Sequence, residues 1–269
     1  MPTAIPDDII FCIVKSLQGE TSVLQACALT AQSWYLPARK YLHASITIGK
    51  SPRVQGRLEF YKARPDLLDL IEIMEITSHS SDLLATLEGM KFSSLTTLSL
   101  VTLTEGQGDT IINLLHQKLP ALNSLSIKNA TFSKDTFLTF MSHLARLTSL
   151  SFSDIHFPKN DGQQTSSSKG SAEVSAADNV PRCLRFIELD YSDGSYAFVK
   201  WLRRLAVMPP IEYVMITRRD SRYQRGRKIQ TLASALSPKT LKVIHINKYG
   251  RASIQKNQDL RGKNIHHTG

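Results

Sequence analysis

The stretch Leu95-Thr96-Thr97-Leu98-Ser99-Leu100 has the pattern L-x-x-L-x-L, with small polar residues between the leucines. Six further segments repeat it with other apolar residues admitted at the three leucine positions. They are Leu122/Leu125/Ile127, Leu147/Leu150/Phe152, Leu184/Ile187/Leu189, Ile211/Val214/Ile216, Leu241/Ile244/Ile246 and a weaker copy at Ile71/Met74/Ile76. The alternation x-L-x-L is typical of a short strand with one buried face, so the sequence predicts a series of similar strands.

The spacing of these copies indicates a repeat. Their first positions lie roughly 24 to 30 residues apart, with one wider gap, and leucine-rich repeats have periods of about 20 to 29 residues. One such unit cannot cover its own apolar face, so units stack and share a core. The alternative is an α/β domain with unrelated strands, which one copy would favour and many regularly spaced copies do not. We expect an α/β fold, a leucine-rich-repeat solenoid whose parallel strands are joined by right-handed crossovers.

Helical patterns occupy several of the intervals between these strands. They cover Ser81–Leu87, Asp109–Leu119, Ser133–Leu144 and Ser195–Val207, each with apolar residues spaced three or four apart. Ser133 is a suitable N-cap for the third of them. Each unit is therefore predicted to run strand, loop, helix, loop.

The first fifty residues have a different character and predict three short helices. Apolar residues from Ile9 to Leu17 follow a helical spacing, and Gly19 is placed to end that helix. Thr21 or Ser22 can cap a second helix, and Pro37 suits the first turn of a third. After the third helix, isoleucines at positions 46 and 48 alternate as in a strand.

The N-terminal segment resembles an F-box, and in particular the divergent F-box proteins of mushroom-forming fungi. The segments that carry the resemblance are Ile5-Pro6-Asp7-Asp8-Ile9-Ile10, Leu17 and Leu24-Gln25-Ala26-Cys27-Ala28-Leu29-Thr30-Ala31-Gln32-Ser33-Trp34. The chain departs from the family pattern at Ile5, Asp8 and Thr30, where leucine, glutamate and valine are usual. The alternative is a generic three-helix cap that seals the first repeat.

The resemblance implies a function, because F-box modules are often followed by leucine-rich repeats. It implies a substrate-recognition adaptor of a Skp–cullin–F-box ubiquitin ligase, active in ubiquitin-dependent degradation. The helical module would bind a Skp-type adaptor of the cullin complex, and the repeats would bind a target protein. The adaptor-binding residues it implies are Pro6, Ile9, Ile10, Ile13, Leu17, Leu24 and Trp34.

These patterns divide the chain into five parts. The predicted parts are an F-box-like helical module at 1–48, repeats at 49–157, a disordered insertion at 158–181, further repeats at 182–248 and a disordered basic tail at 249–269. The insertion is rich in serine and polar residues and accounts for the widest gap between copies. We expect it to be inert, the alternative being a phosphorylated or partner-binding loop.

The formal net charge of +10 is concentrated after residue 197. Basic residues are most concentrated in segment 218–228, which contains Arg218, Arg219, Arg222, Arg225, Arg227 and Lys228. A solvated loop is the simplest interpretation. The alternatives are a nuclear localisation or nucleic-acid contact and a patch that steers acidic protein partners. No nucleic-acid-binding motif accompanies this segment, so a role in binding nucleic acid is the weaker hypothesis.

The sequence contains no catalytic or cofactor motif. We find no Gly-rich phosphate loop, no H-E-x-x-H and no G-x-S-x-G, and Cys12, Cys27 and Cys183 lack metal-ligand spacing. Cys12 and Cys27 are expected to be buried thiols. No apolar run suits a membrane span and no signal peptide is recognised. We therefore expect a non-enzymatic, cytoplasmic or nuclear protein without cofactor or metal. A repeat scaffold without a ligase role is the main alternative, and a nucleic-acid-associated protein is the second.

Overall fold

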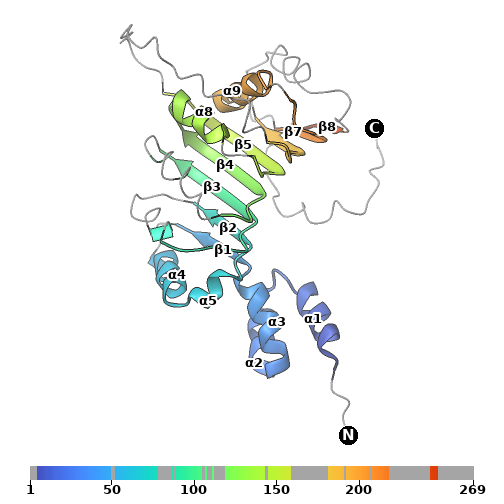
Figure 1. Cartoon of the computed structure of the whole chain (residues 1–269). Helices are drawn as coiled ribbons and strands as arrows, with labels where there is room; N and C mark the ends of the chain where they lie inside the picture. Colours follow the sequence, from blue (N-terminus) through green and yellow to red (C-terminus); the bar gives the residue numbers. More distant parts are fainter. Residues whose placement is uncertain are drawn as a thin grey trace.

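The structure, a computed structural model (Figure 1), describes most of the chain in several segments. The described residues are 5–49, 52–77, 86–87, 89–104, 107, 111, 119–142, 145–158, 181–190, 192–205, 207–217 and 243–247. Most of the helices expected at 81–87 and 109–119, most of the insertion at 158–181, the basic segment 218–228 and the tail at 249–269 lie outside these residues.

Three helices open the chain and a single sheet follows them. The helices are α1 (Asp7–Ser16), α2 (Thr21–Thr30) and α3 (Gln32–His43). The strands are β1 (Ser45–Ile48), β2 (Ile73–Ile76), β3 (Thr97–Leu103), β4 (Ser124–Thr131), β5 (Ser149–His156), β6 (Phe186–Leu189), β7 (Tyr213–Thr217) and β8 (Val243–Asn247). The other described helices are α4 (Pro52–Ala63), α5 (Pro65–Leu68), α8 (Lys134–Ser142) and α9 (Asp193–Leu202).

All eight strands belong to one parallel sheet, in which the order of the strands is the order of the chain. The register aligns the copies of the sequence pattern: Leu98 is opposite Leu125, and Leu125 is opposite Leu150. The same column continues through β6 and β7 at Ile187 and Val214. The α/β fold class and the parallel arrangement of the predicted strands are thereby confirmed.

The apolar columns of the sheet pack against helices to form one large core. Phe152 of β5 lies between two helices, with its ring centroid 5.6 Å from that of Phe137 in α8 and 5.5 Å from that of Phe198 in α9. These three rings are fully buried. Pairs of aromatic rings at such distances stabilise a core beyond the area they bury. The rings therefore tie α8, β5 and α9 together on one side of the sheet.

Three neighbouring strands share an unusual backbone feature near their carboxyl ends. Thr102, Asn129 and Asp154 have φ angles of 66°, 52° and 62°. The flanking residues are paired across the sheet, so these three positions lie side by side. After each residue with positive φ, the next side chain points into the core. In β3 this side chain is Leu103, which is 3% exposed. The register stays one-to-one on both sides of these residues, so the side chains are re-aimed without breaking the sheet.

Several expected boundaries are corrected by the structure. The N-cap residue of α2 is Glu20, without a side-chain cap hydrogen bond, so neither Thr21 nor Ser22 caps this helix. Pro37 lies inside α3, which begins at Gln32. The expected helix at 195–207 is α9, which begins at Asp193 after Ser192 as N-cap. Of these three helices only α9 has a side-chain cap, in which the Ser192 hydroxyl accepts from the Ser195 amide.

Other expected features are present. Gly19 follows α1 with φ 105°, a conformation that favours glycine. Ser133 caps α8, because its hydroxyl accepts a hydrogen bond from the Thr136 amide at 3.1 Å. Residues 45–48 form β1 and pair with β2, so the helical part of the predicted 1–48 module ends at His43.

Gly194 allows α9 to approach β5 closely. A Cβ atom at this position would lie 2.3 Å from Cγ2 of Ile155. Overpacking a tight core costs about 1–3 kcal/mol, so Gly194→Ala is expected to lower the melting temperature. The matched control is Gly56→Ala in α4, where an added Cβ meets no atom within 4 Å. Alanine favours a helix over glycine by about 1 kcal/mol, so the control should melt at or above the wild-type temperature. Equal melting of Gly194→Ala and wild type would contradict the close contact.

Thr102 is the least suited of the three residues with positive φ, because its side chain is branched at Cβ. Thr102→Gly removes this strain at an exposed position and is expected to raise the free energy of unfolding by about 0.5–1 kcal/mol. The same change at Thr97, which lies inside β3, should lower it, because glycine weakens a strand interior. Denaturant titration of both variants measures the difference, and a loss of stability in Thr102→Gly would refute the expectation.

Candidate functional site

The three N-terminal helices form a small unit with its own core. Its fully buried side chains are Ile10, Val14, Leu24 and Ala38, which form a cluster separate from the core of the sheet. Both α1 and α2 pack against α3. Figure 1 shows the three helices projecting beyond the β1 end of the sheet. A core of four buried residues leaves much of the apolar surface of these helices uncovered.

Exposed apolar side chains are concentrated on this unit. The large hydrophobic residues that are exposed in the described part of the chain number twelve, and eight of these lie between residues 5 and 36. They are Ile5, Ile9, Phe11, Ile13, Val23, Leu29, Tyr35 and Leu36. Ile9 and Ile13 stand four residues apart and share one face of α1, where they are 47% and 37% exposed. A concentration of exposed apolar residues typically marks an interaction site.

The structure separates the residues that the sequence had placed in one adaptor-binding set. Pro6, Ile9 and Ile13 are exposed, and Leu17 and Trp34 are partly buried. Ile10 and Leu24 are each 2% exposed and belong to the core of the helices. Their side chains stabilise the unit and are not accessible to a partner in this conformation. The exposed face of α1 is therefore the part of the predicted set that a partner can reach.

The sequence pattern could not make this separation because α1 is apolar on more than one face. Its core face carries Ile10, Val14 and Leu17, and its other faces carry Ile9, Phe11 and Ile13. Sequence reasoning overlooked Phe11, whose ring lies 5.9 Å from that of Tyr41. It also overlooked Val23, Leu29 and Leu36, which stand out only once the three helices are packed.

The structure shows the settings of Thr30 and of the two N-terminal cysteines. The Thr30 hydroxyl donates to the Ala26 carbonyl at 2.8 Å, so its hydrogen-bonding need is met within α2. Cys12 is exposed, so the expectation of a buried thiol is wrong there, whereas Cys27 is half-buried against the core of the helices. Cys12 lies on a side of α1 that points away from the small core.

Three contacts join α3 to the first elements of the sheet. Arg39 pairs with Asp66 of α5, and Lys40 Nζ lies 3.8 Å from Glu72 Oε1. His43 Nδ1 lies 2.9 Å from the Tyr61 hydroxyl in α4. Only Ala44 separates α3 from β1. The one-residue connection and these three contacts place the end of α3 directly beside α4, α5 and the start of β2.

The charges at this junction alter two pKa values. The hydrogen bond from Arg64, together with that from Arg39, lowers the pKa of Asp66 to about 2. Burial lowers the pKa of His43, and the nearby Arg39 and Arg64 lower it further. The junction therefore holds Asp66 charged and favours His43 in its neutral form.

His43 predicts a pH dependence of stability. Because its pKa is lower in the folded state than in the unfolded chain, the unfolded state binds more protons as the pH falls below about 6.5. The contribution of neutral His43 to stability is therefore present above that pH and is lost below it. Asp66 titrates near pH 2 and does not contribute in this range.

The measurement is the melting temperature at pH 5.5 and pH 7.5. We expect wild type to lose more stability at pH 5.5 than His43→Gln does. Tyr61→Phe is the control, because it removes the hydroxyl partner of His43 while preserving the burial that is the main cause of the shift. An unchanged pH dependence in His43→Gln would refute the assignment.

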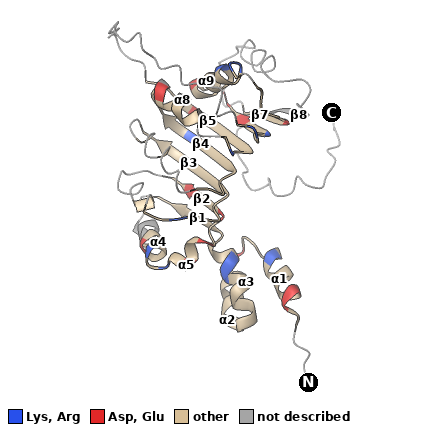
Figure 2. Ribbon diagram, in the orientation of Figure 1, with Lys and Arg blue, Asp and Glu red and all other residues tan. Residues whose placement is uncertain are grey.

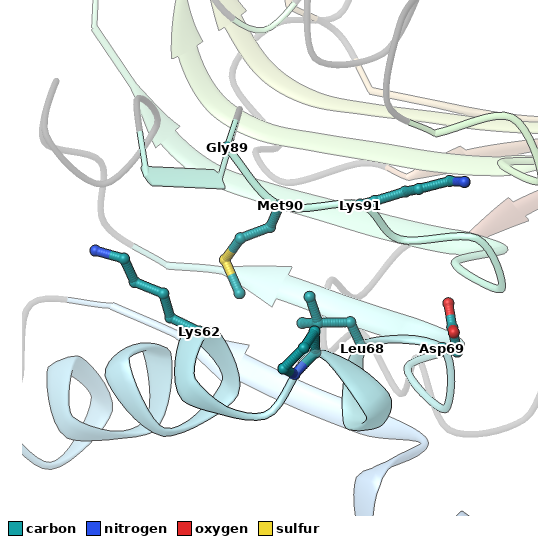
Figure 3. A pocket seen from close by; sticks show the side chains of 7 residues that line it. Lys62, Leu68, Asp69, Gly89, Met90 and Lys91 are labelled. Atoms are coloured by element: carbon teal, nitrogen blue, oxygen red, sulfur yellow. The ribbon is translucent and has the colours of Figure 1, made fainter.

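One hollow of about 360 Å³ lies where α4 and α5 meet the segment before β3 (Figure 3). Met90 and Leu68 line its middle, and Lys62 stands at one side. Lys91 extends in the opposite direction to Lys62, and the Asp69 carboxylate accepts a hydrogen bond from Ser93. The charged groups do not converge on a common point, and no nucleophile and base face each other here. This hollow has none of the features of an active site.

Asp190, directly after β6, is the centre of a polar cluster. One carboxylate oxygen accepts from the Ser192 amide at 2.9 Å and from the Ser195 hydroxyl at 3.0 Å. The other accepts from the Asp154 amide at 2.5 Å. This carboxylate therefore joins β5 to the start of α9 and serves a structural purpose. Among the described residues, no group of His, Cys, Asp and Glu side chains has the arrangement of a metal site.

Comparisons with known proteins leave the family open. No family model matches the chain, and no curated protein matches it. In the part of the chain that the structure describes, no helix is both long and apolar enough to cross a membrane. The basic residues at 218, 219, 222, 225, 227 and 228 lie outside the described residues, so their arrangement remains a prediction.

Proposed function

We propose that this chain is a non-catalytic substrate-recognition adaptor of a Skp–cullin–F-box ubiquitin ligase. In this proposal α1–α3 are the F-box and bind a Skp-type adaptor, while the sheet and its helices form a leucine-rich-repeat solenoid that binds a target protein. The observation that carries the proposal is the concentration of exposed apolar side chains on the N-terminal helices. Residues 5–34 resemble the F-box pattern, and this resemblance indicates a Skp-type adaptor as the partner of that surface.

The proposed mechanism is proximity. Two binding surfaces on one rigid body hold a target close to a ubiquitin-charged enzyme, which raises the effective concentration of the target without new chemistry. The short connection at Ala44 and the contacts of Arg39, Lys40 and His43 support this role, because they fix the direction between the two surfaces. The chemistry of ubiquitin transfer would belong to other subunits.

A repeat scaffold whose front helices serve only as a cap is the competing function. A cap would share its buried residues with the end of the sheet, whereas the four buried residues of the helical unit form their own cluster. A cap also has no use for the exposed residues Ile9, Ile13 and Leu29, the last of which is 89% exposed. These two observations favour a docking role.

The test is recovery of a Skp-type adaptor by the full chain and by the double variant Ile9→Asp/Ile13→Asp. We expect recovery to fall at least about tenfold, because buried apolar anchors dominate such interfaces. The melting temperature should change little, since both side chains are exposed. Val207→Asp is the matched control, because Val207 is 66% exposed and follows α9, far along the chain.

The two functions predict different results. Wild-type binding that is lost only in the α1 variant supports the adaptor role. If the folded wild-type chain recovers no adaptor, the ligase role is refuted and the scaffold remains.

A further inference from the structure

The side of the sheet opposite the large core carries two rows of small hydroxyl side chains. Across β3, β4 and β5 the first row is Thr97, Ser124 and Ser149, and the second is Ser99, Ser126 and Ser151. We call this side the open face. Except for Ser151, these side chains are partly exposed. Parallel sheets are usually covered on both faces, so a face lined by small, partly exposed residues is available to a partner.

Two carboxylates end the second row. The register continues it from Ser99 to Glu75 on β2, and from Ser151 to Glu188 on β6. Adjacent strands lie about 4.8 Å apart, so four strand spacings place Glu75 and Glu188 roughly 19 Å from each other along the sheet. Neither carboxylate has a cationic partner among the described residues.

Glu188 is held in a defined orientation. Its Oε2 accepts from the Ser151 hydroxyl at 2.9 Å, and its Oε1 accepts from the Thr217 hydroxyl at 3.3 Å. Hydroxyl donors on both oxygens fix the position of the carboxylate before any ligand arrives. An oriented carboxylate on a partly exposed face is suited to receive a lysine or arginine side chain.

Between the carboxylates lie two hydroxyls without partners. The Oγ atoms of Ser99 and Ser126 are shielded from solvent and make no hydrogen bond. A shielded polar group without a partner is unfavourable, and a change of χ1 rotamer would turn either hydroxyl towards the open face. A ligand with backbone or side-chain hydrogen-bonding groups at this point would satisfy both.

We propose that the open face binds an extended polypeptide segment whose basic side chains pair with Glu75 and Glu188. A distance of roughly 19 Å corresponds to about six residues of extended chain, so the two basic residues would stand about six apart. The residues between them would lie over the serine rows. This inference rests on the proposed function, because it names the chemistry of the target that the receptor would recognise.

The local charge of the open face favours this ligand over an acidic one. Glu75 and Glu188 lie on the face, and Lys128 on β4 is the cation nearest its centre among the described strands. Figure 2 shows few charged residues on the described strands. The whole chain carries a net charge of +10, which repels basic peptides at long range. Binding of a basic peptide would therefore come from the local carboxylates.

The experiment uses the full chain and an array of twelve-residue peptides. Each peptide carries two arginines separated by one to nine glycine, serine and asparagine residues, and matched series replace arginine by glutamine or glutamate. We expect binding to peak when the arginines stand about six apart and to be absent from the other two series. Rising salt should weaken it, as expected for exposed charges.

Variants assign the binding to the two carboxylates. Glu75→Gln and Glu188→Gln should each weaken the best peptide about fivefold, as the loss of about 1 kcal/mol of ion pairing implies. Glu59→Gln, at an exposed position of α4, is the matched control and should bind as wild type does. Equal binding of arginine and glutamine peptides, unchanged binding in Glu188→Gln, or preference for the glutamate series would each overturn the proposal.

The result is separable from the adaptor test. Ile9→Asp/Ile13→Asp should bind the arginine peptide normally, and Glu188→Gln should recover the Skp-type adaptor normally. A failed array with normal adaptor recovery would overturn only the open-face inference, and the reverse result would overturn only the ligase role.

Discussion

In-register pairing of the parallel strands is the constraint on which the rest of the structure depends. Met74, Leu98, Leu125, Leu150 and Ile187 occupy successive strands at equivalent positions, so the apolar side of each strand continues into that of the next. A slip of one residue would turn every one of these side chains to the opposite face. The register therefore fixes the large core and the opposite row of hydroxyl and carboxyl groups at the same time. The helices that pack on Phe152 depend on it as well.

The helical unit is limited by its small size rather than by strand register. It is too small to bury all of its apolar residues, and the packing of α1 and α2 on α3 encloses only four of them fully. Small units with incomplete cores usually gain stability from a partner or a neighbouring domain. Here the neighbouring sheet contacts the unit mainly through polar pairs at Arg39, Lys40 and His43. The apolar remainder faces outward, which is the basis of the proposed docking role.

Features that depend on neighbouring residues could be predicted from the sequence, whereas features that depend on packing between distant segments could not. The strands follow from local alternation and a regular period, and both survive into the structure. The burial of Ile10 and the exposure of Ile9 depend on how three helices pack, which their own residues do not specify. The cluster around Asp190 was also missed, because its donors come from β5 and α9, which are far apart in the sequence. The placement of Glu75 and Glu188 at the two ends of one row can be recognised only once the register of the strands is known.

The direct pairing of β5 with β6 limits how much the length of their connection matters for the fold. These strands pair directly although the sequence between His156 and Phe186 is longer than the other intervals. The entropy lost in closing a loop grows only with the logarithm of its length, and the backbone ladder between β5 and β6 is made by residues outside the connection. Insertions and deletions at this point are therefore nearly neutral for the fold. Changes of length within 159–180 are expected to cost little in loop entropy, whereas Phe157 and Leu184 at the ends of the connection pack into the core and must be kept.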